Sequence, residues 1–304
     1  MTATAATPAW AFEAYVSVRN RLPSPGPHSV TPQVAETLAD IAAPYDLILL
    51  DAYGVLNVGE QAIPGAPERM AELRRAGKRT MVVTNSAGYP KRAMMARYAR
   101  LGFDFAPHEV VSSREALLRH LDRQPKRRWG LMLAQGYGLE EFEALEARFL
   151  DDAPLTYDWA EGFLLVGSEG WTEARQARLE AALRERPRPV LVGNPDIVAP
   201  REGGLSLEPG HFAHRLADAT GVRPEFFGKP FRQIYDLALS RLHPSPASEK
   251  ILMVGDTLHT DILGGRSMGL ATALVTAFGS LAGSDVAAAI ATSGITPDFV
   301  VERT

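Results

Sequence analysis

Short apolar runs alternate with longer amphipathic segments along most of the chain from Tyr45 onward. This alternation is typical of buried parallel strands that are connected by helices. It predicts an α/β protein with a mostly parallel sheet. We expect strands at Leu47–Leu50, Thr80–Thr84, Val110–Ser112, Leu131–Ala134, Phe163–Val166, Val190–Val192, Ile251–Val254 and Ala273–Val275.

Segments between the predicted strands carry helix signals. Residues Lys91 to Leu101 fit one helix, because Gly102 follows at the position where helices commonly end. Residues Arg114 to Leu121 fit another, because Ser112 and Glu115 have the spacing of a capping box. The first 26 residues show no clear period, so they could form either a mobile arm or a short helix laid on the core.

Polar residues come directly at the ends of three predicted strands. Asp51 follows the strand at 47–50, Thr84 ends the strand at 80–84 and is followed by Asn85, and Asp256 comes two residues after the strand at 251–254. In open α/β sheets, ligands bind outside the carboxyl ends of the strands. We therefore expect these side chains to share one ligand site.

Asp51 opens the segment Asp51-Ala52-Tyr53-Gly54, in which Gly54 permits a sharp backbone turn. An aspartate at a strand end can attack phosphorus as a covalent nucleophile if a cation suppresses the repulsion between the two anions. It can also be a residue that only caps a turn. The motif by itself leaves both interpretations open.

Three further side chains suit a phosphoryl group: Thr84, Asn85 and Lys229. A hydroxyl and an amide can donate hydrogen bonds to phosphoryl oxygens, and an ammonium group supplies positive charge. Taken singly, the segment Thr84-Asn85-Ser86 could be an ordinary loop, and Lys229 could be a solvated surface residue.

Asp256 and Asp261 lie in one predicted strand-to-helix turn. Two carboxylates so placed repel each other unless a cation binds between them. Mg²⁺ prefers oxygen ligands and would also neutralise a phosphate. The alternative is that Asp261 merely caps the following helix.

Composition and length narrow these possibilities. The chain has no cysteine, which excludes thiolate metal sites and cysteine nucleophiles. A net charge of -4, with basic residues scattered among acids, argues against a nucleic-acid partner. Without a secretory signal or an apolar stretch of spanning length, we expect a cytoplasmic protein with no membrane partner. At 304 residues the chain exceeds the usual single domain, which favours a second, smaller unit.

The order Asp, Thr, Lys and paired Asp on successive strand ends resembles the haloacid dehalogenase superfamily of phosphohydrolases. The segments Ile63-Pro64-Gly65-Ala66 and Gly193-Asn194-Pro195-Asp196 resemble its nitrophenylphosphatase-like subclass IIA. The resemblance spans about residues 45–301 and implies a Rossmann-like core with an α/β cap inserted between the second and third motifs. Residues 114–222 carry strands and helices but none of the phosphate motifs, which independently indicates an insertion. We expect an N-terminal extension at 1–40, a core at 41–113 and 223–304, and a cap at 114–222.

The resemblance also implies roles for the site residues. Asp51 would form an aspartyl-phosphate during hydrolysis of a small phosphorylated metabolite, such as a sugar phosphate or a nucleotide. The phosphoryl group would be held by Thr84, Asn85 and Lys229. Mg²⁺ would be held by Asp51, Asp256 and the backbone carbonyl of Tyr53, with Asp261 either a ligand or the partner of one. A homo-oligomer formed through the cap is left open.

Tyr53 departs from the family pattern, in which a second aspartate two residues after the nucleophile acts as acid and then base. Such catalysis contributes about 10²- to 10⁴-fold, and a phenol is rarely ionised at neutral pH. We therefore expect a slow phosphatase that accumulates phospho-Asp51, or one that uses another base such as His259. His259 could instead be a surface histidine. The alternative function is a phosphometabolite-binding or regulatory module with little turnover.

Overall fold

The apolar run at 47–50 forms an inner strand of a seven-stranded sheet in the computed structural model, which describes residues 6–26 and 30–304. The pairings in this sheet are all parallel, so the predicted α/β class is confirmed. In order across the sheet the strands are β1 (Gln33–Thr37), β16 (Phe299–Arg303), β15 (Ala271–Val275), β14 (Ile251–Gly255), β2 (Leu47–Leu50), β5 (Arg79–Thr84) and β6 (Val110–Ser112).

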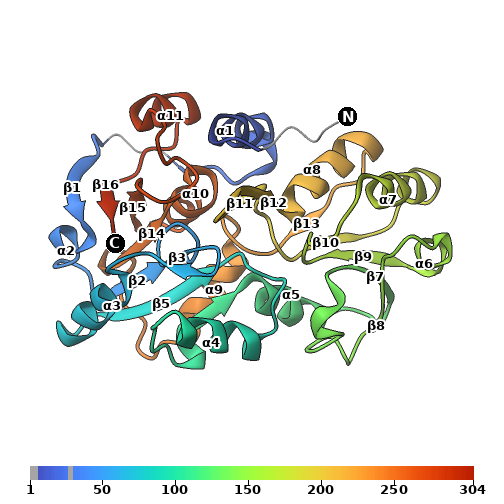
Figure 1. The fold of residues 1–304 in the computed structure, drawn as a ribbon, viewed down its shortest axis with the longest axis horizontal. Coiled ribbons are helices and arrows are strands. Elements are labelled where there is room, and N and C mark those ends of the chain that lie inside the picture. The colour runs from blue at the N-terminus through green and yellow to red at the C-terminus, as the bar shows by residue number, and fades with distance from the viewer. Residues whose placement is uncertain (1–5, 27–29) are drawn as a thin grey trace.

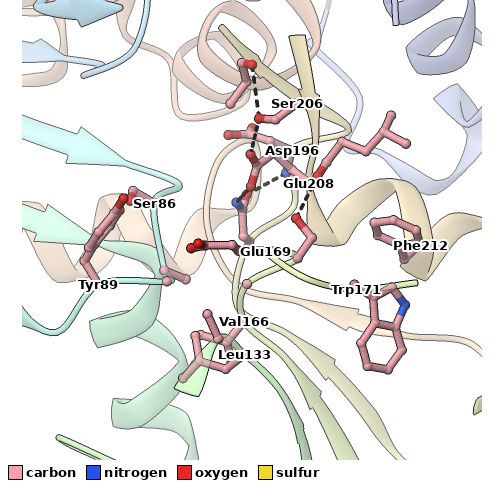
Figure 2. Close-up of a pocket in the computed structure, with 18 of the residues that line it drawn as sticks. Ser86, Tyr89, Leu133, Val166, Glu169, Trp171, Asp196, Ser206, Glu208 and Phe212 are labelled. Atoms are coloured by element: carbon pink, nitrogen blue, oxygen red, sulfur yellow. Dashed lines mark hydrogen bonds between the residues drawn. The ribbon is translucent and has the colours of Figure 1, made fainter. Parts of the chain in front are cut away.

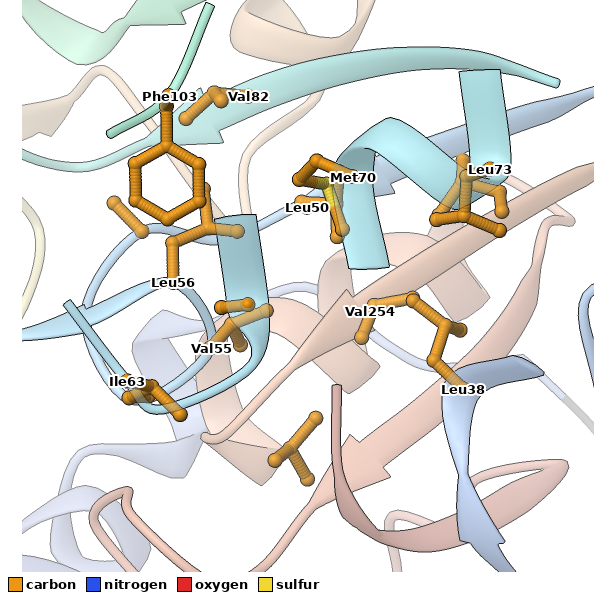
Figure 3. Close-up of a cluster of buried hydrophobic side chains, with 14 of the residues drawn as sticks. Leu38, Leu50, Val55, Leu56, Ile63, Met70, Leu73, Val82, Phe103 and Val254 are labelled. Atoms are coloured by element: carbon orange, nitrogen blue, oxygen red, sulfur yellow. The ribbon is translucent and has the colours of Figure 1, made fainter. Parts of the chain in front are cut away.

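Both faces of this core sheet are buried, and the residues of β2 show why. Successive side chains of a strand point to opposite faces. Ile48 and Leu50 therefore join one apolar cluster, while Leu47 and Leu49 join another. All four side chains are fully buried. Figure 3 shows the first cluster, in which Leu50 and Val254 come from the neighbouring strands β2 and β14. A strand buried on both faces has to be continuously apolar, as this one is.

Helices cover the two faces of the core sheet. The predicted capping box is present, because the Ser112 hydroxyl accepts a hydrogen bond from the Glu115 backbone N–H and the Glu115 carboxylate accepts one from the Ser112 N–H. Gly102, which follows the predicted helix end, has a φ of 86°. The helices of this part are α2 (Leu38–Ile41), α3 (Ala66–Arg75), α4 (Lys91–Arg100), α5 (Ser113–Leu121), α9 (Arg232–Leu239), α10 (Leu263–Ser267) and α11 (Val286–Ser293).

A second parallel sheet lies beside the first (Figure 1) and has an apolar cluster of its own. It corresponds to the predicted inserted α/β cap. Its strands are, in order, β13 (Glu225–Phe226), β10 (Val190–Val192), β9 (Gly162–Leu165), β7 (Arg128–Met132) and β8 (Glu146–Phe149), and its helices are α6 (Pro154–Trp159), α7 (Glu173–Glu185) and α8 (Pro209–Thr220). Two small antiparallel hairpins complete the fold: β11 (Val198–Arg201) with β12 (Gly204–Leu207), and β3 (Asn57–Val58) with β4 (Gln61–Ala62).

The expected domain limits at 114 and 222 remain a proposal. Strands of the second sheet run from Arg128 to Phe226, so the last of them begins after residue 222. Helix α5 packs against α9 of the core, although it begins at Ser113. These contacts favour cap limits that lie several residues further along the chain at both ends.

The first forty residues are more than an extension. Strand β1 pairs with β16 at the edge of the core sheet, and α2 follows it directly. Residues Pro8–Ser17 form helix α1, so the second of the two expected arrangements is present, a short helix laid on the rest of the protein. Figure 1 shows α1 between α11 of the core and α8 of the cap. The expectation for residues 1–5 lies outside the described residues. Among the described helices, none has the length and apolar character needed to cross a lipid bilayer.

Candidate active site

Asp51 lies at the carboxyl end of β2, where the backbone turns away from the sheet. Its backbone N–H donates to the Val254 carbonyl at 2.9 Å, so the residue is fixed in register with β14. Gly54 makes the turn with a φ of 80°. Burial raises the pKa of the Asp51 carboxyl to about 6, although the neighbouring Lys229 opposes the shift. The strand end thus presents the carboxyl group at the sheet edge, as the sequence predicts. Its burial was not expected, and it arises because the residues around it enclose the side chain.

Asp256 and Asp261 come from the turn that follows β14 and meet Asp51 there. One carboxylate oxygen from each of the three residues lies within 4.8 Å of the others. A π-helical turn at Leu258–Ile262 carries Asp261 back toward the strand end, where its carboxylate accepts a hydrogen bond of 3.1 Å from the Thr257 N–H. Burial, together with repulsion from the other two carboxylates, raises the pKa of Asp256 to about 8. Three carboxylates so close together call for a compensating cation.

The surroundings of these carboxylates fit a small divalent cation. Hard oxygen donors are the ligands that Mg²⁺ and Ca²⁺ prefer. Glycines line the carboxylates closely: a Cβ atom on Gly54 would lie 2.7 Å from the Asp256 carboxyl carbon, and one on Gly255 would lie 2.0 Å from that of Asp261. Because side chains are missing at these points, the acidic groups converge on one small volume, as a cation site requires.

Lys229 is the cation that the structure itself supplies. Its Nζ atom lies 2.5 Å from Asp51 Oδ1 and 2.7 Å from Asp261 Oδ1, and its side chain is only 1% exposed. Burial lowers the pKa of Lys229, but the Asp261 and Asp51 carboxylates outweigh this effect, so the pKa lies above its ordinary value. Lys229 is therefore a buried ion-pair partner of the site and not the solvated surface residue that was the alternative.

Thr84 and Asn85 lie at the end of β5, next to Lys229. The Asn85 amide nitrogen donates to the Lys229 carbonyl at 2.9 Å and to the Asp196 carboxylate at 2.8 Å, and its carbonyl oxygen accepts from the Lys229 N–H at 2.7 Å. These bonds use both amide hydrogens of Asn85. The Thr84 hydroxyl accepts from the Ser86 N–H at 3.1 Å and keeps its own hydrogen available. A phosphate-binding role for either side chain stays a prediction.

Tyr53 is held between two arginines. The Arg97 guanidinium lies 4.8 Å from the centre of the Tyr53 ring, and that of Arg201 lies 4.7 Å from it. Arg201, on strand β11, also donates a hydrogen bond of 2.8 Å to the Tyr53 hydroxyl. Its other nitrogens donate to Ser206 and Glu208. Sequence reasoning missed both arginines, because neither belongs to a local motif. Arg97 comes from the core helix α4 and Arg201 from the cap hairpin, and only tertiary packing brings them to position 53.

A cavity of about 1000 Å³ opens next to Tyr53, between the core and the cap. Figure 2 shows Ser86 and Tyr89 on one side of it and Trp171 and Phe212 on the other. Apolar and aromatic side chains dominate the lining, and the charged side chains among its described residues are Glu169, Asp196, Arg201 and Glu208. A cavity of this size and composition suits a small organic molecule.

His259 is buried, and it is not among the described residues that line the cavity beside Tyr53. Its ring stacks on Tyr15 at 5.3 Å and meets the edge of Phe12 at 5.7 Å, both on helix α1. Only 1% of the residue is exposed, and burial lowers its pKa to about 4. The expectation that His259 lies at the surface is therefore wrong, and a packing role explains its position better than that of a base.

Comparisons with known proteins identify the family of this chain. A family model described as haloacid dehalogenase-like hydrolase matches residues 48–147, and a second, HAD-hydrolase-like model matches residues 226–303. The chain is 33% identical to glycerol-3-phosphate phosphatase of Gallus gallus over 88% of its own length and 92% of that protein.

Two solved structures are similar over most of the chain. A possible sugar phosphatase of Cytophaga hutchinsonii has a TM-score of 0.77 and 26% identity, covering 90% of this chain and 98% of that one. A glycerol phosphate phosphatase of Mycobacterium tuberculosis in complex with calcium has a TM-score of 0.62 and 27% identity, covering 77% of this chain and 67% of that one.

Proposed function

This chain belongs to the haloacid dehalogenase-like hydrolases, subclass IIA, and from that membership we propose that it hydrolyses a small phosphorylated metabolite through an aspartyl-phosphate on Asp51. The observation that carries the proposal is the meeting of Asp51, Asp256, Asp261 and Lys229 at the sheet edge. A nucleophilic carboxylate can approach a phosphate dianion only where positive charge compensates the repulsion.

In the proposed reaction the Asp51 carboxylate attacks phosphorus while Lys229 pairs with a phosphoryl oxygen in place of one of its present carboxylate partners. Thr84 can donate its hydroxyl hydrogen to the same group. A bound divalent cation, Mg²⁺ in our proposal, would neutralise charge on the phosphate. The residues that would hold it are Asp51, Asp256, Asp261 and the backbone carbonyl of Tyr53.

The relatives and the cavity support a small polar substrate. Two glycerol phosphate phosphatases and a possible sugar phosphatase are among the similar proteins. The cavity of about 1000 Å³ is large enough for either a sugar phosphate or a nucleotide. Polyol and sugar phosphates of this kind are the first substrates to test.

Tyr53 also supports a second candidate, a phosphometabolite-binding module with little turnover. Its phenol replaces the acidic side chain at this position and is engaged by Arg201. In this module the cavity and Lys229 would still bind a phosphate ester, but release of the leaving group would be very slow.

Hydrolysis of 4-nitrophenyl phosphate separates the two candidates, because this leaving group needs no protonation. We expect Mg²⁺-dependent release of nitrophenol that Asp51→Asn lowers by at least about 10³-fold. Asp46→Asn, an exposed residue just before β2, is the matched control and should retain full activity. Tight binding of phosphate by a wild-type protein that releases no nitrophenol would establish the binding module instead.

A further inference from the structure

Position 53 leaves the proposed reaction without an obvious proton donor for the leaving group. The described lining of the cavity contains three acidic side chains, from Glu169, Asp196 and Glu208. Glu208 already accepts hydrogen bonds from Arg201, Ser206 and Asn194. Glu169 is an exposed residue of the cap. Asp196 alone of the three is both in the cavity wall and bonded to a residue of the nucleophile's own sheet edge.

Contacts on several sides fix the position of Asp196. Its carboxylate accepts a hydrogen bond of 2.8 Å from Asn85, the same side chain that clamps the backbone of Lys229. Its backbone N–H donates to the Asn194 side chain at 3.0 Å. The next residue, Ile197, donates its N–H to the Tyr15 hydroxyl at 3.0 Å. A loop held in this way keeps a catalytic group in one orientation.

This loop approaches the core so closely that position 228 of the core has to be glycine. A Cβ atom on Gly228 would lie 2.5 Å from the Asn85 side-chain oxygen and 2.8 Å from Pro195 Cδ. Gly228 also has a φ of 128°, in the region that favours glycine. The segment before Lys229 and the segment before Asp196 are therefore in direct contact, and the Asp196 carboxyl is bonded to Asn85 next to Lys229.

We propose that Asp196, supplied by the cap loop after β10, is the general acid and then the general base of the phosphatase reaction. This role rests on the proposed function. Asp51 forms a bond to phosphorus as the bond from phosphorus to the ester oxygen breaks, and the departing oxygen takes the proton of Asp196 to leave as an alcohol. The Asp196 carboxylate next accepts a proton from a water molecule, whose oxygen attacks the phosphorus. Asp51 departs as a carboxylate, phosphate is released, and Asp196 is again protonated.

The electrostatic surroundings suit this role. Burial raises the pKa of Asp196 well above its ordinary value; Lys229 opposes the shift, and Asp51 adds to it. Asp261 acts in the same direction as Asp51. A raised pKa favours the protonated form of the carboxyl, which is the form that a general acid needs. Asp196 is partly exposed, and it lines the cavity, so a leaving group can reach it.

The test compares esters whose leaving groups differ in their need for a proton. For Asp196→Asn we expect kcat/KM on glycerol phosphate to fall by about 10²- to 10⁴-fold. The value on 2,4-dinitrophenyl phosphate should fall by less than about tenfold, since that leaving group departs as a stable anion. Asparagine keeps an oxygen that can accept the Asn85 hydrogen bond, so the loop should stay in place. Asp158→Asn, which removes an exposed acid from helix α6, should leave both values unchanged.

Two further measurements separate an acid–base role from a structural one. The double variant Tyr53→Asp with Asp196→Asn should have a kcat/KM on glycerol phosphate at least tenfold above that of Asp196→Asn alone, because a carboxyl returns to the usual family position. Rapid quenching of Asp196→Asn with the dinitrophenyl ester should trap phospho-Asp51, because the base for its hydrolysis is missing. Equal losses on both esters, with no rescue, would overturn the role of Asp196.

A second variant covers the case in which Asp196→Asn does not fold. Asp196→Glu keeps the acid but displaces it, and its loss should again be confined to glycerol phosphate. An equal loss on both esters would contradict the proposal. Failure of the proposed function looks different, because the wild-type protein would then hydrolyse neither ester.

Discussion

The Tyr53 hydroxyl accepts a hydrogen bond of 2.8 Å from Arg201, a residue 148 positions further along the chain. This bond connects the turn after the nucleophile to a hairpin of the cap. The same phenol ring lies between the guanidinium groups of Arg97 and Arg201. Tyr53 is therefore part of the contact between the core and the cap, in addition to its place beside Asp51.

Tyr53 should be more important for stability than for the hydrolysis of activated esters. Tyr53→Phe keeps the ring between the two guanidinium groups and removes one hydrogen bond, so we expect a loss of about 1 kcal/mol in the free energy of unfolding. Tyr53→Leu also removes both cation–π contacts, at a further cost of about 1 to 3 kcal/mol. Urea unfolding measures both values. Equal stability of the two variants would show that the ring contacts contribute nothing.

Metal binding should stabilise the folded protein, because the carboxylates that repel one another are brought together only by folding. At 100 times its dissociation constant, Mg²⁺ should raise the free energy of unfolding by about 2.7 kcal/mol. Thermal denaturation with Mg²⁺ and with EDTA measures this change without any need for activity.

Asp256→Asn should largely remove the response to Mg²⁺, since this residue is one of the three converging carboxylates. Asp46→Asn, an exposed residue of the same charge, should retain the full response. A shift in melting temperature that is the same in both variants would place the ion elsewhere.

Tyr15 should stabilise the protein through two separable contacts. Its hydroxyl is the acceptor for the Ile197 N–H, and its ring stacks on His259. Tyr15→Phe leaves a buried N–H without a partner and should cost about 1 to 3 kcal/mol. Tyr15→Ala also removes the buried ring and should cost about 3 to 5 kcal/mol in total. The two variants are compared by urea unfolding, and a negligible effect of both would mean that α1 contributes little to the fold.

His214 should make the protein less stable in mild acid. Burial, with a smaller effect of Arg21, lowers the pKa of His214 to about 4, whereas a histidine in an unfolded chain has a pKa of about 6.5. Between these values the unfolded state binds a proton that the folded state excludes. Stability is therefore lost as the pH falls from 6.5 toward 4, by about 2 kcal/mol at pH 5.

His214→Phe should remove this part of the pH dependence, because the aromatic contact with Phe226 is kept while the titrating group is lost. His108→Gln, at an exposed position, is the control and should leave the pH dependence as it is in the wild type. Urea unfolding of the wild type and of both variants at pH 7 and pH 5 gives one stability difference for each protein. An unchanged difference in His214→Phe would contradict the assignment.

Several features could be predicted from the sequence because they depend on neighbouring residues only. Leu47–Leu50 is continuously apolar, and a strand of that kind has to be covered on both faces. A polar residue directly after such a strand is then presented at the sheet edge. This reasoning predicted Asp51 and Asp256 at one edge of the sheet. The resemblance to the family added Asp261, and the structure brings all three together. Edge strands such as β1 and β8 carry polar and charged residues, so the same pattern missed them.

Other features depend on how the cap packs on the core, and the sequence contains no local signal for that. Arg201 reaches Tyr53 over 148 positions, Asp196 reaches Asn85 over 111, and Tyr15 reaches Ile197 over 182. Each of these contacts forms only where the core, the cap and helix α1 pack against one another. The sequence by itself therefore determined the fold class and the acidic cluster at the edge of the core sheet. Only the tertiary structure decided which cap residues face that cluster, because the angle and distance between two packed units arise from contacts spread over the whole chain.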